Sequence, residues 1–177
     1  MDLAGVLALF RYNQWANERT VLGVAQAPQA VFSHHLHPLP EGSIQGVLTH
    51  IVWSEWIWLQ RWKGVTNLVF QPADFALVPQ ELVFAASDFP DVDAVRQRLE
   101  AVGKETFAYL GDLKPGDLDA VVEYRTLGGA VWPRVLWRQL VHAVNHSTYH
   151  RGQVAAMLRE LGYAPVASDL VGFDDQA

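Results

Sequence analysis

The chain has 177 residues, of which 50% are hydrophobic, and a formal net charge of −6. This length predicts a single domain over residues 1–177, and an acidic chain without a lysine/arginine cluster argues against nucleic acid as a partner. No apolar run reaches the ~20 residues needed to span a bilayer, so no membrane partner is expected. The absence of cysteine excludes disulfides and protein thiolate ligands, and it fits a cytoplasmic location. The N-terminus also lacks the features of a signal peptide.

Two helices are predicted in the first part of the chain. Apolar residues near a helical repeat indicate a helix over Leu3–Val24, and prolines then favour a loop over residues 25–42, with room for one short helical turn. Ser43 is a good N-cap for a second helix over Ile44–Trp62. Residues 63–90 show little periodicity and are expected to form a long connection, of the kind that often borders a site.

The second part of the chain predicts two more helices with a hairpin between them. A third helix begins within residues 88–91 and ends near Leu110. Residues 121–132 favour two short strands around Gly128-Gly129. Pro133 is expected to open the fourth helix, which we predict over Leu136–Leu161.

These elements predict the fold class. Four long helices can bury their apolar stripes together as an all-α four-helix bundle, here with long crossover loops and a short β-hairpin before the last helix. The tail, residues 163–177, is expected to form an irregular cover. In such bundles, metal sites are built from side chains on facing helices.

His146 and His150 are the most informative pair in the sequence. A spacing of four on a helix places both imidazoles on one face, about 5–6 Å apart at Cβ, where they could bind one divalent metal. His142 extends the same stripe, so the spacing allows either 142/146 or 146/150 as the metal-binding pair. The alternative is a helix with partly buried, hydrogen-bonded imidazoles and no metal.

His50 lies in the second predicted helix and is the third candidate ligand. Small and apolar residues surround it on its helix face, as suits an imidazole turned into a bundle. Its alternative role is a core histidine bonded to a backbone carbonyl. Three histidine ligands without an obvious fourth would leave the metal open to water or substrate.

Three segments resemble the DinB/YfiT-like family of bacterial metalloproteins. They are the tracts YNQWAN at 12–17, GVLTHI at 46–51 and HAVNHSTYHRGQ at 142–153, in the same order and with similar separation. The resemblance implies an up-down-down-up bundle, often a homodimer. It also implies one divalent ion, which could be zinc, nickel, iron or manganese, with His50, His146 and His150 as ligands. His142 would then be a neighbour of the site.

The resemblance also implies a reaction, because some members of this family are thiol S-transferases. The predicted function is therefore transfer of a small-molecule thiol to a small electrophilic substrate, in stress response or detoxification. The open position could instead hold a reactive water, which would make the protein a metal-assisted hydrolase. Ser147 stands where zinc peptidases of the HExxH type carry glutamate, which argues against a peptidase. The sequence is also compatible with a non-catalytic metal-binding stress-response protein, or with a dimeric scaffold whose histidines are structural.

Further residues are candidates for the pocket. Gln153 follows His150 by three positions and could contact the site or point to solvent. Tyr12 and Trp15 on the first helix could line a pocket or belong to the core, and His142 could flank the metal. Arg151 is expected to form an ion pair at the surface or at a dimer interface.

Three further polar residues of the first two predicted helices are Asn13, Asn17 and Glu55. Asn13 and Asn17 are four apart and could bond to each other or to a partner. Glu55 lies about 140° around the helix from His50, at about 100° per residue, so we expect it to point away from the metal.

Overall fold

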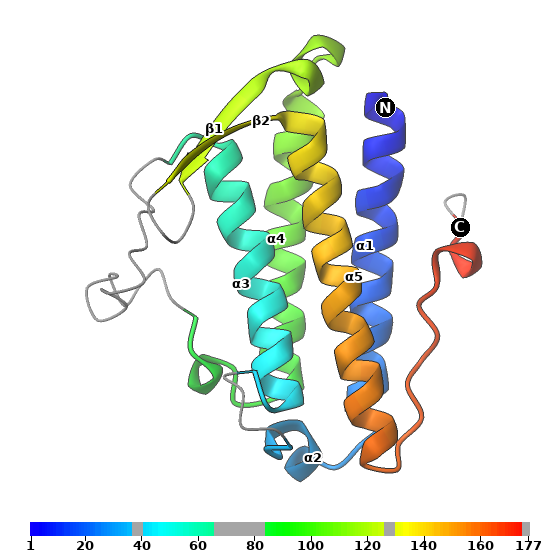
Figure 1. Ribbon diagram of the computed structural model, residues 1–177. Helices are drawn as coiled ribbons and strands as arrows, with labels where there is room; N and C mark the ends of the chain where they lie inside the picture. Colours follow the sequence, from blue (N-terminus) through cyan, green and yellow to red (C-terminus); the bar gives the residue numbers. More distant parts are fainter. Residues whose placement is uncertain (37–40, 66–83, 126–129, 175–177) are drawn as a thin grey trace.

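The structure is a computed structural model that describes residues 1–36, 41–65, 84–125 and 130–174. Four long helices form a bundle (Figure 1): α1 (Leu3–Ala25), α3 (Ile44–Trp62), α4 (Val92–Asp112) and α5 (Leu136–Glu160). α1 and α5 run in one direction and α3 and α4 in the other, so the predicted up-down-down-up bundle is confirmed. Within the described residues, no helix combines the length and apolar character needed to cross a membrane.

Side-chain caps explain where three of the long helices begin. Asp2, Ser43 and Asp91 each accept a hydrogen bond from the backbone N–H three residues later, at 2.8–3.0 Å. Such caps satisfy donors that have no partner within the first helical turn. α5 has no side-chain cap and follows a strand directly, with the N–H of Leu136 donating to the carbonyl of Ala120 at 2.9 Å.

The predicted hairpin is present, but the role assigned to Pro133 was wrong. Strand β1 (Val121–Arg125) pairs antiparallel with β2 (Val131–Val135), and Pro133 lies within β2 opposite Glu123. In a sheet of two strands both strands are edges, where a proline without an N–H is tolerated. The Gly128-Gly129 turn lies outside the described residues.

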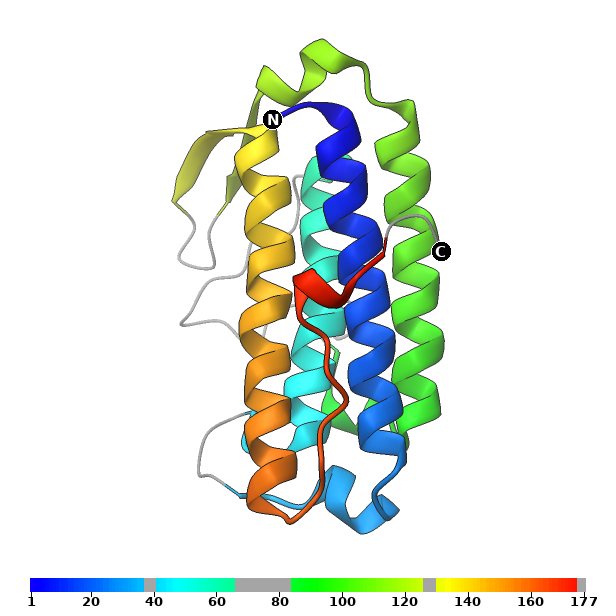
Figure 2. The same cartoon turned by 90° about the vertical axis from the view of Figure 1, so that its right-hand side faces the viewer.

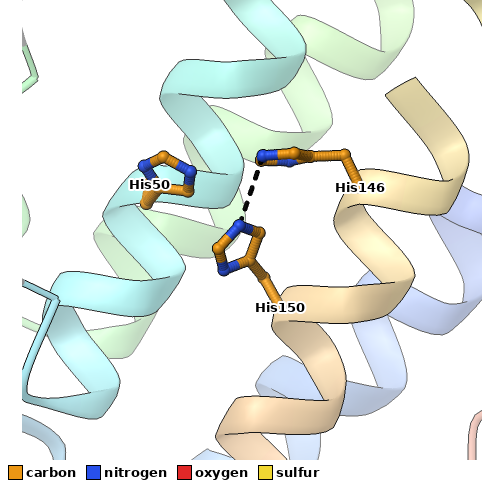
Figure 3. Close-up of side chains that lie close together, drawn as sticks. All are labelled: His50, His146 and His150. Carbon is orange, nitrogen blue, oxygen red and sulfur yellow. Dashed lines mark hydrogen bonds between the residues drawn. The ribbon is translucent and has the colours of Figure 1, made fainter. Parts of the chain in front are cut away.

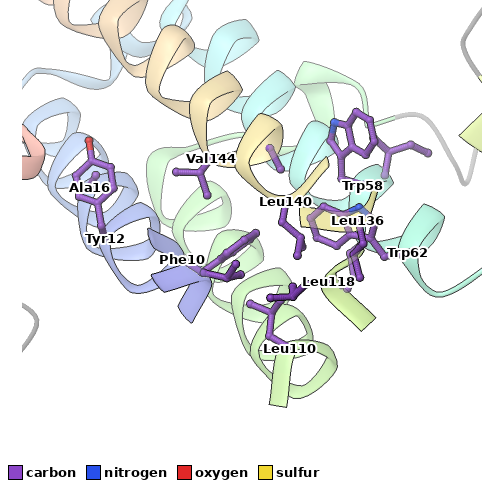
Figure 4. Packing of buried hydrophobic residues seen from close by; sticks show 14 residues of the cluster. Phe10, Tyr12, Ala16, Trp58, Trp62, Leu110, Leu118, Leu136, Leu140 and Val144 are labelled. Carbon is purple, nitrogen blue, oxygen red and sulfur yellow. The ribbon is translucent and has the colours of Figure 1, made fainter. Parts of the chain in front are cut away.

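The order of the helices around the bundle places the α3/α5 edge and the α1/α4 edge on opposite sides. α5 lies between α1 and α3, and α4 completes the ring between α3 and α1. The α3/α5 edge is therefore opposite the α1/α4 edge. Inside the ring, apolar side chains of all four helices pack together, as Phe10, Trp62, Leu110 and Leu140 do in Figure 4.

Short segments close the ends and one side of the bundle. Helix α2 (Gln29–Ser33) lies at the end where α1 finishes and buries Phe32. After α5 the chain turns back and lies over α1 and α5 (Figure 2). This C-terminal segment is fixed by the Tyr12 hydroxyl, which donates to the carbonyl of Ser168 at 3.1 Å, and by Phe173, whose ring lies 5.5 Å from that of Trp15.

Candidate metal centre

His50, His146 and His150 meet at the α3/α5 edge (Figure 3). Each offers one ring nitrogen, and these nitrogens all lie within 4.8 Å of one another. The ring centroids of His146 and His150 are 4.4 Å apart, as expected for positions four apart on a helix. His50 reaches them from α3, with its centroid 4.4 Å from that of His150 and 5.2 Å from that of His146. Of the two histidine pairs that the spacing allowed, 146/150 is therefore the one that joins His50.

An oxygen atom lies against Nδ1 of both His146 and His150 on α5. The Nδ1 of His150 lies 2.7 Å from Oε1 of Gln153, and the Nδ1 of His146 lies 3.1 Å from Oγ of Ser54. An amide oxygen only accepts hydrogen bonds, so Nδ1 of His150 carries the proton and its Nε2 has a free lone pair. Partners of this kind usually select the tautomer of a metal-binding histidine.

His50 has the same arrangement with a carboxylate. Its Nδ1 lies 3.6 Å from Oε1 of Glu41, the residue two positions before the α3 cap. This contact is longer than a hydrogen bond, but it places negative charge beside Nδ1 of His50. The Nδ1 of each ring thus lies near an oxygen, at 2.7, 3.1 and 3.6 Å, and the Nε2 atoms of His146 and His150 face each other.

The contact between the two α5 rings tests whether a metal ion fits. Nε2 of His146 and Nε2 of His150 are 3.2 Å apart. Without a metal this contact is a hydrogen bond when His146 carries its proton on Nε2, which the Ser54 hydroxyl allows by donating to Nδ1. When Ser54 instead accepts a proton from Nδ1, both Nε2 lone pairs are available, at a separation that suits two nitrogens each about 2.0–2.1 Å from one ion. Three neutral nitrogens are a donor set that zinc, nickel, iron and manganese all accept. The residues therefore fit a divalent metal ion.

Burial favours the neutral form of two of these histidines, His146 and His50. It lowers the pKa of His146 to about 3, with further lowering by the neighbouring His150, His50 and His142. It also lowers the pKa of His50, which His150 lowers further and Glu41 partly restores. A metal-binding imidazole must be neutral, so at neutral pH neither ring has to lose a proton before it binds an ion.

Aromatic side chains surround the three histidines. The ring of Trp53 lies 6.0 Å from that of His50, and the ring of Tyr149, which is 66% exposed, meets His150 edge-on at 5.1 Å. His142 lies one turn before His146, 5.8 Å away between centroids, and packs against Trp58. His142 is thus a neighbour of the group rather than one of its three members.

The other predicted pocket residues occupy different places. Gln153 contacts the site through His150. The rings of Tyr12 and Trp15 pack against Phe173 of the C-terminal segment, and none of their described contacts involves the three histidines. The surface location expected for Arg151 was wrong, because its side chain is only 3% exposed.

Behind the histidines lies a polar network that the sequence did not predict. Arg151 donates to Oδ1 of Asn13 and to Oδ1 of Asn17, at 2.7 Å each. The amide nitrogens of these asparagines donate to Oε1 of Glu55 at 2.7 and 2.8 Å, and the hydroxyl of Ser147 donates to the same oxygen at 2.8 Å. The network joins α1, α3 and α5. One sequence signal was Glu55, a charged residue between apolar residues of its helix, which requires a partner when it is buried.

The fold and these side chains define the class of protein: a four-helix bundle whose facing helices carry a three-histidine group that could hold a metal ion. The chain belongs to the DinB family, whose profile matches residues 3–177, so the resemblance of the three sequence segments is confirmed. It is 24% identical over 161 residues to Protein DinB of Bacillus subtilis (strain 168), covering 91% of this chain and 88% of that protein.

Two crystal structures share the fold. A DinB-like protein from Bacillus cereus superposes with a TM-score of 0.61 at 17% identity, covering 94% of this chain and 97% of that one. A conserved protein from Enterococcus faecalis superposes with a TM-score of 0.59 at 20% identity, covering 85% and 93%. At these identities the likeness concerns the fold alone.

Proposed function

We propose that this protein is a metal-dependent thiol S-transferase that joins a low-molecular-weight thiol to a small electrophile in stress response or detoxification. The observation that carries the proposal is the donor set. Three imidazoles each bring one ring nitrogen within 4.8 Å of the other two, and within the described residues no carboxylate or cysteine joins that group. A divalent ion held there keeps open positions and supplies the positive charge that favours the thiolate form of a thiol at neutral pH.

The protein's own groups would orient the reactants. Ser54 and Gln153 hold the imidazoles of His146 and His150 in place, and the exposed ring of Tyr149 offers an apolar surface beside His150. The chain has no cysteine, so the nucleophilic sulfur must come from the cosubstrate. In the reaction a sulfur–carbon bond forms, the bond from that carbon to its leaving group breaks, and the thiol proton passes to solvent.

A positive charge near the site suits a thiol that carries carboxylates. The Arg61 guanidinium lies 4.7 Å from the ring centroid of Trp58, and the ring of Trp58 also meets that of His142. Partial burial lowers the pKa of His142, and the positive charge of Arg61 is the second, smaller cause of this lowering. Glutathione and bacillithiol both carry carboxylates that such a guanidinium can bind.

Metal analysis and a conjugation assay test the proposal. The purified protein is loaded with zinc or nickel and given glutathione or bacillithiol together with 1-chloro-2,4-dinitrobenzene. We expect thioether formation above the uncatalysed rate, loss of both metal and activity in His150→Ala, and retention of both in the control His35→Ala, whose side chain is exposed in the loop after α2.

Each remaining outcome would favour a different function. Bound metal without conjugation of any thiol and acceptor pair would replace the proposal by a non-catalytic metal-binding protein. Hydrolysis of an ester without added thiol would favour the hydrolase. Failure to bind any divalent ion would leave the histidines structural. A homodimer and a cytoplasmic location stay predictions.

A further inference from the structure

A cavity lies on the opposite edge of the bundle from the three histidines. It has a volume of about 350 Å³ and opens between α1 and α4, which lie side by side in Figure 2. Its mouth carries the exposed side chains of Gln14, Glu18 and Glu100, while Glu55 and Ala143 reach it from α3 and α5. This volume falls in the range of about 300–1,000 Å³ typical of small-molecule sites.

Glu55 is the polar group that reaches the cavity from inside the bundle. Among the described residues, this side chain accepts three hydrogen bonds, and all three are made to Oε1. The lone pairs of Oε2 are therefore available to a ligand. Asn13 and Asn17 also line the cavity, but their amides are already bonded to Glu55 and Arg151. A carboxylate only accepts hydrogen bonds, so a ligand that meets Glu55 must bring a donor.

The charges around the mouth favour the same kind of ligand. Arg96 is the one basic residue among the described residues that line the cavity, and Asp93 already pairs with its guanidinium at 3.1 Å. Lys104, on the same helix, pairs with Glu100 at 2.8 Å. Glu18 thus adds a carboxylate at the mouth, and the local potential favours a cation.

Aromatic side chains form the apolar part of the cavity. Phe10, Trp62 and Phe107 line it, and the rings of Phe10 and Trp62 meet edge to face with centroids 6.1 Å apart. Such faces hold an apolar body and attract an adjacent cation. We propose that this cavity is a binding site for a small organic cation, namely an ammonium group attached to an aromatic or branched apolar body.

The test uses the zinc-loaded full chain and three probes of similar shape. These are 2-phenylethylamine, which is cationic at neutral pH, the neutral 2-phenylethanol and the anionic phenylacetate. NMR titration follows the side-chain amides of Asn13 and Asn17 and the indole N–H of Trp62. We expect the amine to shift these signals and to bind about 10-fold or more tightly than the alcohol, with phenylacetate weakest at this site.

Variants locate the binding. Glu55→Gln keeps an acceptor for the three donors but removes the charge, and should weaken the amine about 10-fold. A Cβ at Gly103 would meet only the side chain of Gln14, at 3.6 Å, so Gly103→Leu extends into the cavity and should abolish binding, whereas Gly103→Ala should retain it. His150→Ala should also retain it, because the three histidines lie on the other edge.

Several results would overturn the inference. These are equal affinity for the amine and the alcohol, amine-induced shifts confined to the histidines, or unchanged amine binding in a folded Gly103→Leu protein. If Glu55→Gln does not fold, the comparison of the leucine and alanine variants at position 103 decides alone.

Discussion

Replacing Arg151 by methionine should destabilise the protein more than any other single change of an arginine on α5. The guanidinium is 3% exposed and donates three hydrogen bonds of 2.6–2.7 Å, to Asn13, Asn17 and Thr148. Burial lowers its pKa, and Tyr12 and Glu55 only partly oppose this effect. The intact network therefore adds little net stability, whereas breaking it is expensive because its remaining polar groups stay buried.

The magnitude follows from what the substitution leaves behind. In Arg151→Met the two asparagine oxygens lose their donor and the carboxylate of Glu55 loses its compensating charge. Removing one partner of a buried charged network costs about 3–5 kcal/mol. With an m-value of about 2 kcal/mol per molar urea, the unfolding midpoint should fall by roughly 2 M.

The assay is urea unfolding of the metal-free protein, followed by far-UV circular dichroism. Arg159→Met is the matched control, because Arg159 lies on the same helix with an exposed side chain and should change stability by less than about 0.5 kcal/mol. In the double variant Arg151→Met with Glu55→Gln, part of the loss should be recovered, since the uncompensated charge is gone. Equal midpoints for Arg151→Met and Arg159→Met would refute the reasoning.

Three further predictions concern the metal centre and α4. Ser54→Ala removes the partner of His146 Nδ1 and should weaken zinc binding about 10–100-fold. Competition with a chelating dye measures the affinity, and an unchanged value would mean that Ser54 does not orient the ring. The folded pKa of His146, about 3, lies below its unfolded value of 6.5, so the unfolded chain binds more protons between these values. The contribution of His146 to the stability of the metal-free protein should therefore be fully present above about pH 6.5 and should be lost as the pH falls toward 3. The free energy of unfolding should fall by at most about 1.4 kcal/mol per pH unit, and by less with solvent screening. In urea unfolding, His146→Gln should flatten this slope. Gly103→Ala should raise the free energy of unfolding by about 0.5–1 kcal/mol, because alanine favours a helix and its Cβ would meet Gln14 at an ordinary contact distance of 3.6 Å. Thermal unfolding measures this change, and a decrease in stability would show that position 103 does not accept a methyl group.

The sequence predicted the helices well because their signals are local. Ser43 caps α3 as expected, and α3 begins and ends at the predicted residues. Pro133 was misassigned because a proline can open a helix or lie in an edge strand, and only the pairing with β1 distinguishes these roles. The metal-binding histidine pair had the same kind of ambiguity, since the spacing allowed two pairs until α3 placed His50 beside one of them.

The buried network could not be predicted in the same way. Helical periodicity gives the direction of a side chain relative to its own helix, not which helix lies opposite. Arg151 is one residue past a histidine at the edge of the bundle, so it was assigned to an ion pair at the surface or at a dimer interface. The structure shows that α1 covers that direction and presents Asn13 and Asn17 to it. Two asparagines four apart were a signal for a shared buried partner, but their distance along the chain gave no indication of its identity.

The metal centre and the network are linked by the geometry of α3 and α5. Three pairs of consecutive residues each place one member at the histidine group and the next in the network: Ser54-Glu55, His146-Ser147 and His150-Arg151. Because consecutive residues on a helix are about 100° apart, one rotation of each helix satisfies both sets of contacts. Turning α5 by one residue would remove the imidazoles from His50 and at the same time withdraw Arg151 from the asparagines. The buried charges therefore act on the histidines without touching them, since they favour the one helix orientation in which three ring nitrogens can share an ion.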